Sequence, residues 1–208
     1  MFTGIVQAQA LVQRVERRGD IVTIALKFQG DYLKGIAIGA SVSVHGCCLT
    51  VTSFTQTEAT FDMVPETISR TSFKNLHEGD FVNVERSLKF GDEVGGHILS
   101  GHVDVVASIA KIEKLEQSQI MTFQLPTAWT KYVFEKGYVA LNGASLTITR
   151  VDRDSSRFTI SLIPETLAKT TFGVAKEGDD VNVEIDRSTQ AIVDTVERVL
   201  AQRLREGS

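Results

Sequence analysis

The 208-residue chain lacks the features by which several large classes of protein are recognised. No run of apolar residues approaches the ~18 that a membrane-spanning helix needs, so we expect no membrane association. The 22 basic residues are outnumbered by 26 acidic ones, the net charge is −4, and no basic block is present. Because nucleic-acid surfaces carry clustered Lys and Arg side chains, we expect no nucleic-acid partner.

Cysteine is scarce as well, since Cys47 and Cys48 are the only two in the chain. Adjacent cysteines cannot form a disulfide without severe strain. The N-terminal segment MFTGIVQAQALVQRVERRGD has no cationic region ahead of an apolar run, so it does not resemble a signal peptide. We therefore expect a reduced protein of the cytoplasm.

The motifs of common metal and nucleotide sites are missing too. The four histidines, His45, His77, His97 and His102, are not accompanied by a cluster of carboxylates or cysteines at a familiar ligand spacing. We therefore predict no metal site. Neither the G-x-x-x-x-G-K-[ST] phosphate loop nor the G-x-S-x-G elbow of hydrolases occurs in the chain.

What the chain does contain is an internal repeat. VHGCCLTVTS (44–53) returns as LNGASLTITR (141–150), PETISRTSF (65–73) as PETLAKTTF (164–172), and EGDFVNVE (78–85) as EGDDVNVE (177–184). The first pair is offset by 97 residues and the others by 99, as a two-residue insertion between them would give. The start, MFTGIVQ, lines up with ILSGHVD (98–104). This period is too long for a solenoid, so each copy is predicted to be a small domain.

Within each copy the apolar residues alternate with polar ones, which is typical of strands. Several short strands in ~90 residues favour a small closed barrel over an open sheet. The glycine-rich segment 89–97 suits a connector between domains, which gives limits of 1–97 and 98–187. TAWTKYVFEKG (127–137) is predicted to be a short helix that ends at Gly137.

The C-terminal segment 188–208 has a different pattern. STQAIVDTVERVLAQRL begins with Ser188 or Thr189 as a plausible helix cap. It places apolar side chains at three- and four-residue spacing, namely Val193, Val196 and Leu200, flanked by Ile192, Val199 and Leu204. This stripe could cover the helix's own barrel or pack between subunits, and the pattern alone favours neither.

The repeat separates the two cysteines. Cys48 aligns with Ser145 and lies two residues before Thr50, so both face the same side of a strand, whereas Cys47 aligns with Ala144 and is predicted to pack behind it. Small residues filling a tapering barrel would explain one copy, but repetition in both copies gives a ligand pocket about equal weight. Duplicated polar positions suit two copies of the same or a similar ligand.

His102 aligns with Ile5, so only the second copy carries an imidazole there. A lone histidine is more often structural than catalytic, but the position of His102 near the other candidate residues increases the weight of a functional role. The tripeptide Pro-Glu-Thr, which occurs in both copies, is explained fully by a turn followed by a helix cap.

The motifs MFTGIV, GCCLTVT, VNVERSLKFGDEVGGHILSGHV, GASLTIT, LIPETLAKTT and VNVEIDRSTQAIVDTVERVLA, in this order, closely resemble the two-barrel riboflavin synthase family over residues 1 to 203. The resemblance implies an all-β fold of two tandem six-stranded Greek-key barrels with short helices, plus a C-terminal trimerisation α-helix in 188–208. It implies a transferase that uses no cofactor. Two molecules of 6,7-dimethyl-8-ribityllumazine would give riboflavin and 5-amino-6-ribitylamino-uracil by four-carbon transfer, the last step of riboflavin biosynthesis.

The resemblance also implies partners. In this family three subunits associate through the C-terminal helix, and each active site pairs the first barrel of one subunit with the second barrel of a neighbour. Lumazine synthase, which supplies the substrate, is a candidate partner. The alternatives are a non-catalytic lumazine- or flavin-binding antenna protein and a purely structural trimer. Intact CLT and SLT motifs in the two copies favour the enzyme.

Carried onto this sequence, the resemblance assigns one pocket to each barrel. The first-barrel pocket is expected to use Gly4, Ile5, Val6, Ser41, Cys48, Leu49, Thr50, Asp62, Met63, Val64, Pro65, Glu66 and Thr67. The second-barrel pocket is expected to use Gly101, His102, Val103, Lys136, Ser145, Leu146, Thr147, Ser161, Leu162, Ile163, Pro164, Glu165 and Thr166. Backbone groups would bind the pyrimidine edge and hydroxyls the ribityl chain.

Among these residues the catalytic candidates are His102, Cys48, Ser41 and Ser145. His102 is the candidate general acid/base, because imidazoles in general exchange protons near neutral pH. Cys48 and Ser41 would assist nucleophilic addition at C7 of one ring. Phe2 would act through packing. One departure from the family pattern is His45, where we expect the Asn that the second copy has as Asn142, and this leaves a local hydrogen bond in question.

Overall fold

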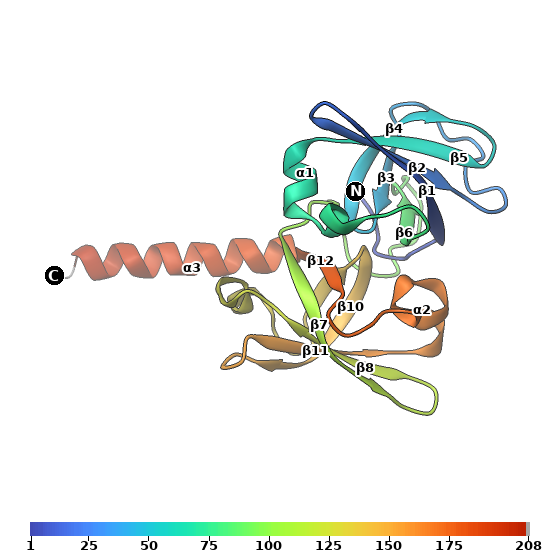
Figure 1. The fold of residues 1–208 in the computed structure, drawn as a ribbon. Coiled ribbons are helices and arrows are strands. Elements are labelled where there is room, and N and C mark those ends of the chain that lie inside the picture. The colour runs from blue at the N-terminus through green and yellow to red at the C-terminus, as the bar shows by residue number, and fades with distance from the viewer. Residues whose placement is uncertain (207–208) are drawn as a thin grey trace.

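The computed structural model describes residues 1–206, and within them the chain forms two closed six-stranded antiparallel barrels followed by a long helix (Figure 1). The predicted all-β fold of tandem barrels with a C-terminal helix is confirmed. The domain limits at residues 97 and 187 stay a prediction. Among the helices of residues 1–206, none is both long and apolar enough to cross a membrane.

The elements follow the repeat. The first barrel contains β1 Ala8–Arg18, β2 Ile21–Lys27, β3 Ser41–Val44, β4 Cys47–Phe54, β5 Glu58–Met63 and β6 Phe81–Arg86, with α1 Pro65–Arg70 and the 3-10 helix η1 Ser72–Asn75 before β6. The second contains β7 Val105–Lys114, β8 Gln119–Gln124, β9 Tyr138–Leu141, β10 Ala144–Asp152, β11 Arg157–Leu162 and β12 Asp180–Ile185, with the 3-10 helix η2 Thr127–Tyr132, α2 Pro164–Lys169 and the 3-10 helix η3 Thr171–Gly173. The terminal helix is α3 Arg187–Glu206.

Both barrels have the same Greek-key strand order. In the first it runs β1-β2-β5-β4-β3-β6, and the matching strands of the second are ordered in the same way. Even the irregularities repeat, because β1 is bulged after Val12 and β7 after Ile109, at equivalent positions. Bulges bend and twist strands, so the matching bulges give both barrels the same curvature.

Strand alternation places one row of side chains in each barrel. In β4, Cys47, Leu49 and Val51 are buried in the first core, whereas Cys48 is half-buried and Thr50 exposed on the outer face. The second core is built around Phe123, which stacks on Phe158 with ring centroids 5.2 Å apart. The separation of Cys47 from Cys48 by strand periodicity is therefore confirmed.

The barrels meet across an approximate twofold axis. Phe2 and Leu99 exchange backbone hydrogen bonds of 2.9 and 3.0 Å, and both side chains are fully buried. Farther along the junction, the Asn83 side chain donates to the Asn142 carbonyl at 3.0 Å, while the Asn182 side chain donates to the His45 carbonyl at 2.9 Å. These reciprocal contacts join the two copies into one body.

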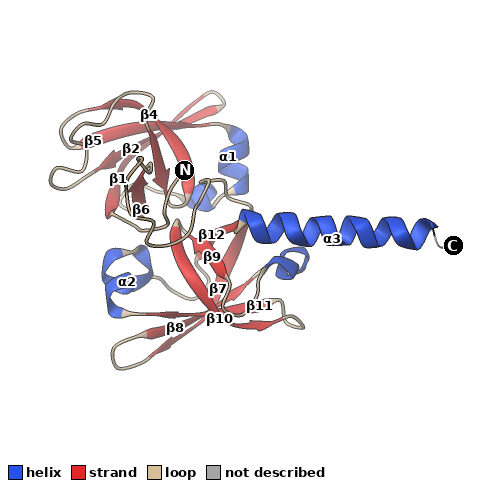
Figure 2. Cartoon of the chain, turned by 180° about the vertical axis from the view of Figure 1, so that it is seen from behind, coloured by secondary structure: helices blue, strands red, loops and turns tan. Residues whose placement is uncertain are grey.

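The helix α3 starts at the junction, and its first half contacts η2 of the second barrel, where Tyr132 donates to Asp194 and Lys131 pairs with Glu197. The rest of the helix projects away from both barrels, as the front and back views agree (Figures 1 and 2). Its cap is neither Ser188 nor Thr189, as the sequence suggested, but Asp186. The Asp186 carboxylate accepts hydrogen bonds from the backbone N and the hydroxyl of Thr189, both at 2.8 Å. Both predicted residues lie inside the first turn, where the donors that Asp186 accepts from are located.

The helix predicted over 127–137 is shorter and of another type. The 3-10 helix η2 ends at Tyr132, and Val133 continues in extended backbone with its side chain buried in the second core. Arg153 donates to the carbonyls of Thr130 and Val133 at 2.9 and 3.4 Å, so these carbonyls are satisfied without further helix. The chain then turns at Lys136, whose φ is +64°.

Candidate functional site

The loops ahead of β1 and β7 cross over to the opposite barrel. The Ser145 amide in β10 donates to the Gly4 carbonyl at 2.8 Å, and Val6 packs against the core of the second barrel. Reciprocally, the Cys48 amide donates to the Gly101 carbonyl at 2.7 Å, and Val103 packs against the core of the first barrel.

This crossing corrects the grouping that the sequence suggested. Gly4, Ile5 and Val6 lie with Ser145 rather than with Cys48. Gly101, His102 and Val103 lie with Cys48 rather than with Ser145. A self-alignment pairs equivalent positions of the two copies, but it does not say which copy a loop contacts.

A buried glutamate holds each crossing loop. Glu85, 3% exposed, accepts from the Thr3 amide at 2.6 Å, the Thr3 hydroxyl at 2.7 Å and the Gly4 amide at 3.0 Å. Burial raises the pKa of Glu85, and the donors of Thr3 and Gly4 act in the opposite direction.

The second copy repeats this arrangement with Glu184. It is also 3% exposed and accepts from the Ser100 amide at 2.7 Å, the Ser100 hydroxyl at 2.6 Å and the Gly101 amide at 2.9 Å. Each carboxylate thus satisfies three donors that the crossing would otherwise bury unpaired.

Glycine is required at the closest point of each crossing. Gly4 and Gly101 have φ of +76° and +77°. A Cβ at Gly4 would lie 2.4 Å from the Cβ of Ser145, and one at Gly101 would lie 2.7 Å from the Cβ of Cys48. Any side chain there would push the loop off the strand that carries the candidate polar residue.

A pocket of about 320 Å³ opens where the first loop meets the second barrel. This volume is within the range of small-molecule sites. Its walls come from the loop, from the start of β10 and from α2. The lining residues are Gly4, Ile5, Val6, Gln7, Ala144, Ser145, Leu146, Glu165, Thr166, Lys169 and Thr170.

His97 is the residue at this site that sequence reasoning missed. Its Nδ1 lies 2.6 Å from the Ser145 hydroxyl, and its ring stacks on Tyr138 with centroids 5.3 Å apart. Its Nε2 is buried and has no hydrogen-bond partner in residues 1–206. Burial lowers the pKa of His97, and the negative charge of Asp186 partly opposes that shift. A neutral imidazole beside a hydroxyl can accept its proton.

The corresponding place in the first copy has no such residue. With the offset of 97 residues, the position equivalent to His97 falls before Met1, so the first copy has no residue aligned with it. On that side, half-buried Cys48 follows Gly46 and Cys47 out of a tight turn, and its neighbour on the same face is exposed Thr50. Ser41 in β3 is paired directly with Thr50. The structure therefore brings Ser41, Thr50 and Cys48 onto one surface.

Some predicted residues have no side chain available to a ligand. Met63 and Leu162 are 2% and 1% exposed and belong to the two barrel cores, so only their backbone groups can face a pocket. Lys136 lies in a separate hollow beside α3 with Phe134 and Ile192, not in the pocket lined by Ser145. Thr147, Ser161 and Ile163 do not line that pocket either, so the role of these residues stays a prediction.

The Pro-Glu-Thr motifs begin the short helices α1 and α2, with Pro65 and Pro164 at their first positions. Glu165 and Thr166 line the pocket described above. In the first copy Glu66 forms a surface ion pair of 3.0 Å with Arg70, and the Asp62 carboxylate accepts from the Thr23 hydroxyl at 2.7 Å. The tripeptide therefore starts each helix, but the cap positions are Val64 and Ile163 and no side chain caps either helix, so the cap part of the prediction is wrong. In the second copy the tripeptide also lines the pocket.

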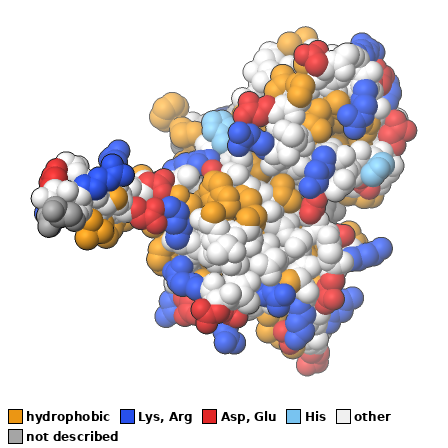
Figure 3. All heavy atoms as spheres, turned by 60° about the vertical axis from the view of Figure 1, so that its left-hand side comes forward, with side chains coloured by type: hydrophobic (Ala, Val, Ile, Leu, Met, Phe, Trp, Pro, Cys, Tyr) orange, Lys and Arg blue, Asp and Glu red, His pale blue; other side chains and the backbone are white. Residues whose placement is uncertain are grey.

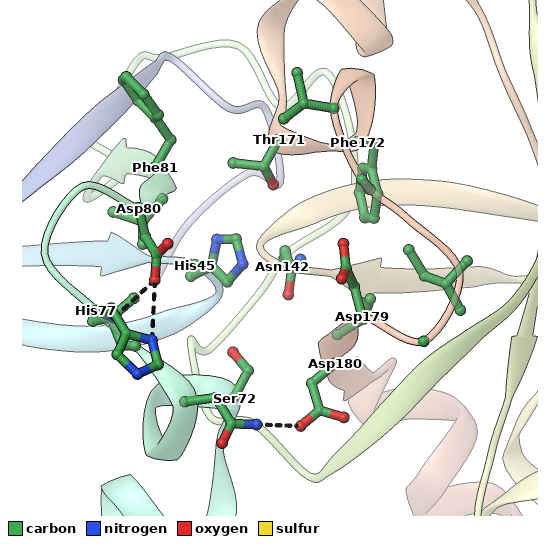
Figure 4. Close-up of a pocket in the computed structure, with 18 of the residues that line it drawn as sticks. His45, Ser72, His77, Asp80, Phe81, Asn142, Thr171, Phe172, Asp179 and Asp180 are labelled. Atoms are coloured by element: carbon green, nitrogen blue, oxygen red, sulfur yellow. Dashed lines mark hydrogen bonds and ion pairs between the residues drawn. The ribbon is translucent and has the colours of Figure 1, made fainter.

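A larger cleft of about 640 Å³ lies between the barrels near His45 and Asn142 (Figure 4). Its carboxylates already have structural partners. Asp80 accepts from the His77 amide and Asp179 from the Lys176 amide, each at 2.8 Å. Within residues 1–206 no group of His, Cys, Asp and Glu side chains has the arrangement to hold a metal ion.

His45 makes the hydrogen bond that was in question because histidine replaces the expected asparagine. Its Nδ1 accepts from the Asn83 amide at 3.2 Å, just as the Asn142 side chain accepts from the Asn182 amide at 2.8 Å. Burial lowers the pKa of His45 to about 4, so the ring is neutral and able to accept. Both residues have positive φ, 51° and 47°, in equivalent turns.

Comparison with known proteins agrees with this geometry. A family model described as a lumazine binding domain matches twice, over residues 3–87 and 100–186. Riboflavin synthase of Escherichia coli (strain K12) is 45% identical over 204 residues, covering 98% of this chain and 95% of that protein. Riboflavin synthase of Bacillus subtilis (strain 168) is 37% identical over 186 residues, covering 89% of this chain and 85% of that protein.

Solved structures share the fold. LumP complexed with riboflavin superposes with a TM-score of 0.83 at 27% identity, covering 90% of this chain and 100% of that one. LumP complexed with 6,7-dimethyl-8-(1'-D-ribityl) lumazine gives 0.81 at 26% identity with the same coverage.

Proposed function

Because the chain belongs to the riboflavin synthase family, we propose that it converts two molecules of 6,7-dimethyl-8-ribityllumazine into riboflavin and 5-amino-6-ribitylamino-uracil. One molecule donates a four-carbon unit and the other accepts it. The donor and acceptor are the same compound, so the transfer is a dismutation and needs no external oxidant or reductant. The protein's task is to hold two rings in register and to move protons.

The ring itself supplies much of the chemistry. The electron-poor pteridine delocalises the carbanion that forms when its C7 methyl group loses a proton. A base beside one ring and a nucleophile at C7 of the other are therefore the groups that the protein must provide.

The two pockets supply such groups in different ways. At the second barrel, neutral His97 beside Ser145 supplies a hydroxyl whose proton has an acceptor at 2.6 Å. At the first barrel, His102 is the acid/base candidate, and Cys48 and Ser41 assist addition at C7 of the bound ring. The His97–Ser145 contact is the observation that carries the enzyme assignment, because a carrier needs no proton acceptor beside its ligand.

We further propose that the active protein is a homotrimer. The apolar stripe of α3 is exposed, with Ile192, Val196 and Leu200 at 64%, 51% and 55%. Figure 3 shows hydrophobic side chains on the surface of the projecting helix. A three-helix bundle would bury them and would bring the first barrel of one subunit to the second barrel of a neighbour. The adjacent free thiols of Cys47 and Cys48 suit the reducing cytoplasm. Association with lumazine synthase stays a prediction.

Incubation with the lumazine substrate tests the function directly. We expect riboflavin absorbance to appear and half of the substrate to be recovered as the uracil product. The matched variant Ser145→Ala should bind the substrate and turn over more slowly by about 10²-fold. Wild-type protein that binds lumazine tightly without forming riboflavin would disprove the synthase assignment.

That outcome would support a carrier instead. The solved LumP complexes hold riboflavin or the ribityl lumazine in the same fold, which gives this alternative its basis. A carrier would retain the ligand unchanged and show its fluorescence, whereas an enzyme would consume it.

A further inference from the structure

The root of α3 is attached to the loop that carries His102. Arg187, the first residue of α3, donates from Nη2 to the His102 carbonyl at 2.9 Å. Its Nη1 donates to the Asp104 carboxylate at 2.8 Å, and that side chain is only 9% exposed. The other oxygen of Asp104 accepts from the Ile185 amide at 2.8 Å. One guanidinium therefore links the helix to both ends of a short loop segment.

The first copy has no such link. Gln7 occupies the position equivalent to Asp104, and its side chain accepts from the Arg86 amide at 2.9 Å. The hydrogen bond between the Asp104 side chain and the Ile185 amide is therefore repeated in the first copy, but without a charge. Leu88 stands at the position equivalent to Arg187, and its side chain has no donor. An arginine that holds the crossing loop therefore occurs only in the second copy, whose loop carries His102.

The backbone of His102 is held on both sides, while its ring is left available. Glu184 binds the Gly101 amide, the Ser100 hydroxyl accepts from the His102 amide at 3.3 Å, and Arg187 binds the His102 carbonyl. The imidazole is exposed and has no hydrogen-bond partner among residues 1–206. With no contact to fix the ring itself, its direction depends on the backbone that carries it.

We propose that Arg187 is a positioning residue that orients His102 for proton transfer and ties that orientation to α3. The inference rests on the proposed function of His102. A bidentate guanidinium suits this role, since its planar fork holds a carbonyl and a carboxylate at once in fixed geometry. Movement of α3 would then reach His102 through one side chain.

The test is a double-mutant cycle in the full-length protein. Arg187→Ala should lower kcat about tenfold and change KM by less than threefold, because the ring loses its direction while the pocket remains. Arg187→Lys, which keeps a single donor, should recover part of that loss. In the His102→Ala background, Arg187→Ala should have no further effect on kcat. Arg203→Ala, on the same helix, is the control and should leave kcat unchanged.

Three results would overturn the proposal. The losses from Arg187→Ala and His102→Ala could multiply, which would show that Arg187 acts elsewhere. Sedimentation could show that Arg187→Ala dissociates the assembly in proportion to lost activity, which would make its role purely structural. Arg203→Ala could lower kcat as much as Arg187→Ala does.

Failure of the proposed function is distinguishable from failure of this inference. If the wild-type protein forms no riboflavin, a crystal structure of Arg187→Ala decides the matter instead. Displacement of residues 101–104 relative to wild type supports the positioning role, and an unchanged segment rejects it.

Discussion

The two candidate ligand sites are built from one repeated scaffold and differ in where they carry an imidazole. At the second barrel, His97 is partly buried, hydrogen-bonded to Ser145 and stacked on Tyr138. At the first barrel, His102 is exposed, and only its backbone is fixed. The crossing loops, the glutamates that hold them and the paired strands are the same on both sides.

The difference shows how a duplicated fold can treat two identical ligands unequally. We expect the symmetric parts to hold the ligands and the departures from symmetry to supply the chemistry. A dismutation needs such inequality, because one molecule must give carbon atoms and the other must receive them. The side with the partly buried base and the side with the thiol are therefore expected to play different roles.

The largest expected effect comes from breaking a symmetric part. Glu85→Ala and Glu184→Ala each remove the acceptor for two amides and a hydroxyl at the barrel junction. Because the amides stay buried without partners, we expect each change to lower the free energy of unfolding by about 3–5 kcal/mol. Urea denaturation of the two variants side by side measures the losses.

Equal losses would confirm that the junction is energetically symmetric. The variants Glu85→Gln and Glu184→Gln keep one acceptor oxygen and serve as controls, with smaller losses expected. A loss for Glu184→Ala that greatly exceeds the one for Glu85→Ala would contradict the symmetry of the scaffold.

The next effect concerns the two imidazoles. His102→Ala should lower kcat about 10²-fold, with KM changed less than threefold, since it removes proton transfer and little binding. His97→Ala should cost kcat at least as much, because it also releases the Ser145 hydroxyl and one face of Tyr138. Steady-state kinetics with the lumazine substrate measure both. Equal loss in kcat and in binding for His102→Ala would remove its acid/base role.

The sequence alone predicted the barrels, the strand carrying Cys48 and Thr50, and its equivalent in the second copy. Strand alternation and the repeat contain that information, since both depend on local spacing. The crossing of Gly4 and Gly101 to opposite barrels was not predictable in this way. Aligning the two halves of the sequence gives the same result whether each loop packs on its own barrel or on the barrel of the other half.

His97 was missed for a related reason. It lies in the connector, ahead of the repeated start, and has no aligned position in the first copy. The signal that could have found it is its position five residues before His102 in a glycine-rich segment, which lets the chain approach Ser145 closely. A Cβ on Gly96 would lie 2.6 Å from the Cβ of Ser145.

A smaller effect is expected from making the pockets chemically alike. Cys48→Ser gives the first barrel the hydroxyl of the second, and we expect kcat to fall about tenfold because a hydroxyl is intrinsically a weaker nucleophile than a thiol. Cys47→Ala is the control. Burial raises the pKa of Cys47 to about 12, and the second copy has Ala144 there, so its activity should stay near wild type. A full-activity Cys48→Ser variant would show that the thiol is not required.

The smallest effect is expected at the one junction position where histidine replaces asparagine, and it depends on pH. Burial holds the pKa of His45 near 4 in the folded protein, against about 6.5 for an ordinary histidine. Between these values the unfolded chain binds more protons than the folded one. Stability contributed by neutral His45 is therefore complete above about pH 6.5 and is lost as the pH falls toward 4, by about 1–3 kcal/mol.

The substitution His45→Asn should remove this part of the pH dependence, because Asn142 shows that an amide oxygen accepts the equivalent hydrogen bond at 2.8 Å. Asparagine also tolerates the positive φ of this turn, so little stability should be lost at pH 7. Urea unfolding of wild type and variant at pH 7 and pH 5 separates the two contributions. The free energies should be close at pH 7, and the variant should be the more stable at pH 5. If wild type and variant lose the same stability on acidification, proton uptake by His45 does not contribute to the pH dependence and the prediction is wrong. The asymmetry between the two halves of the molecule would then be confined to the ligand sites.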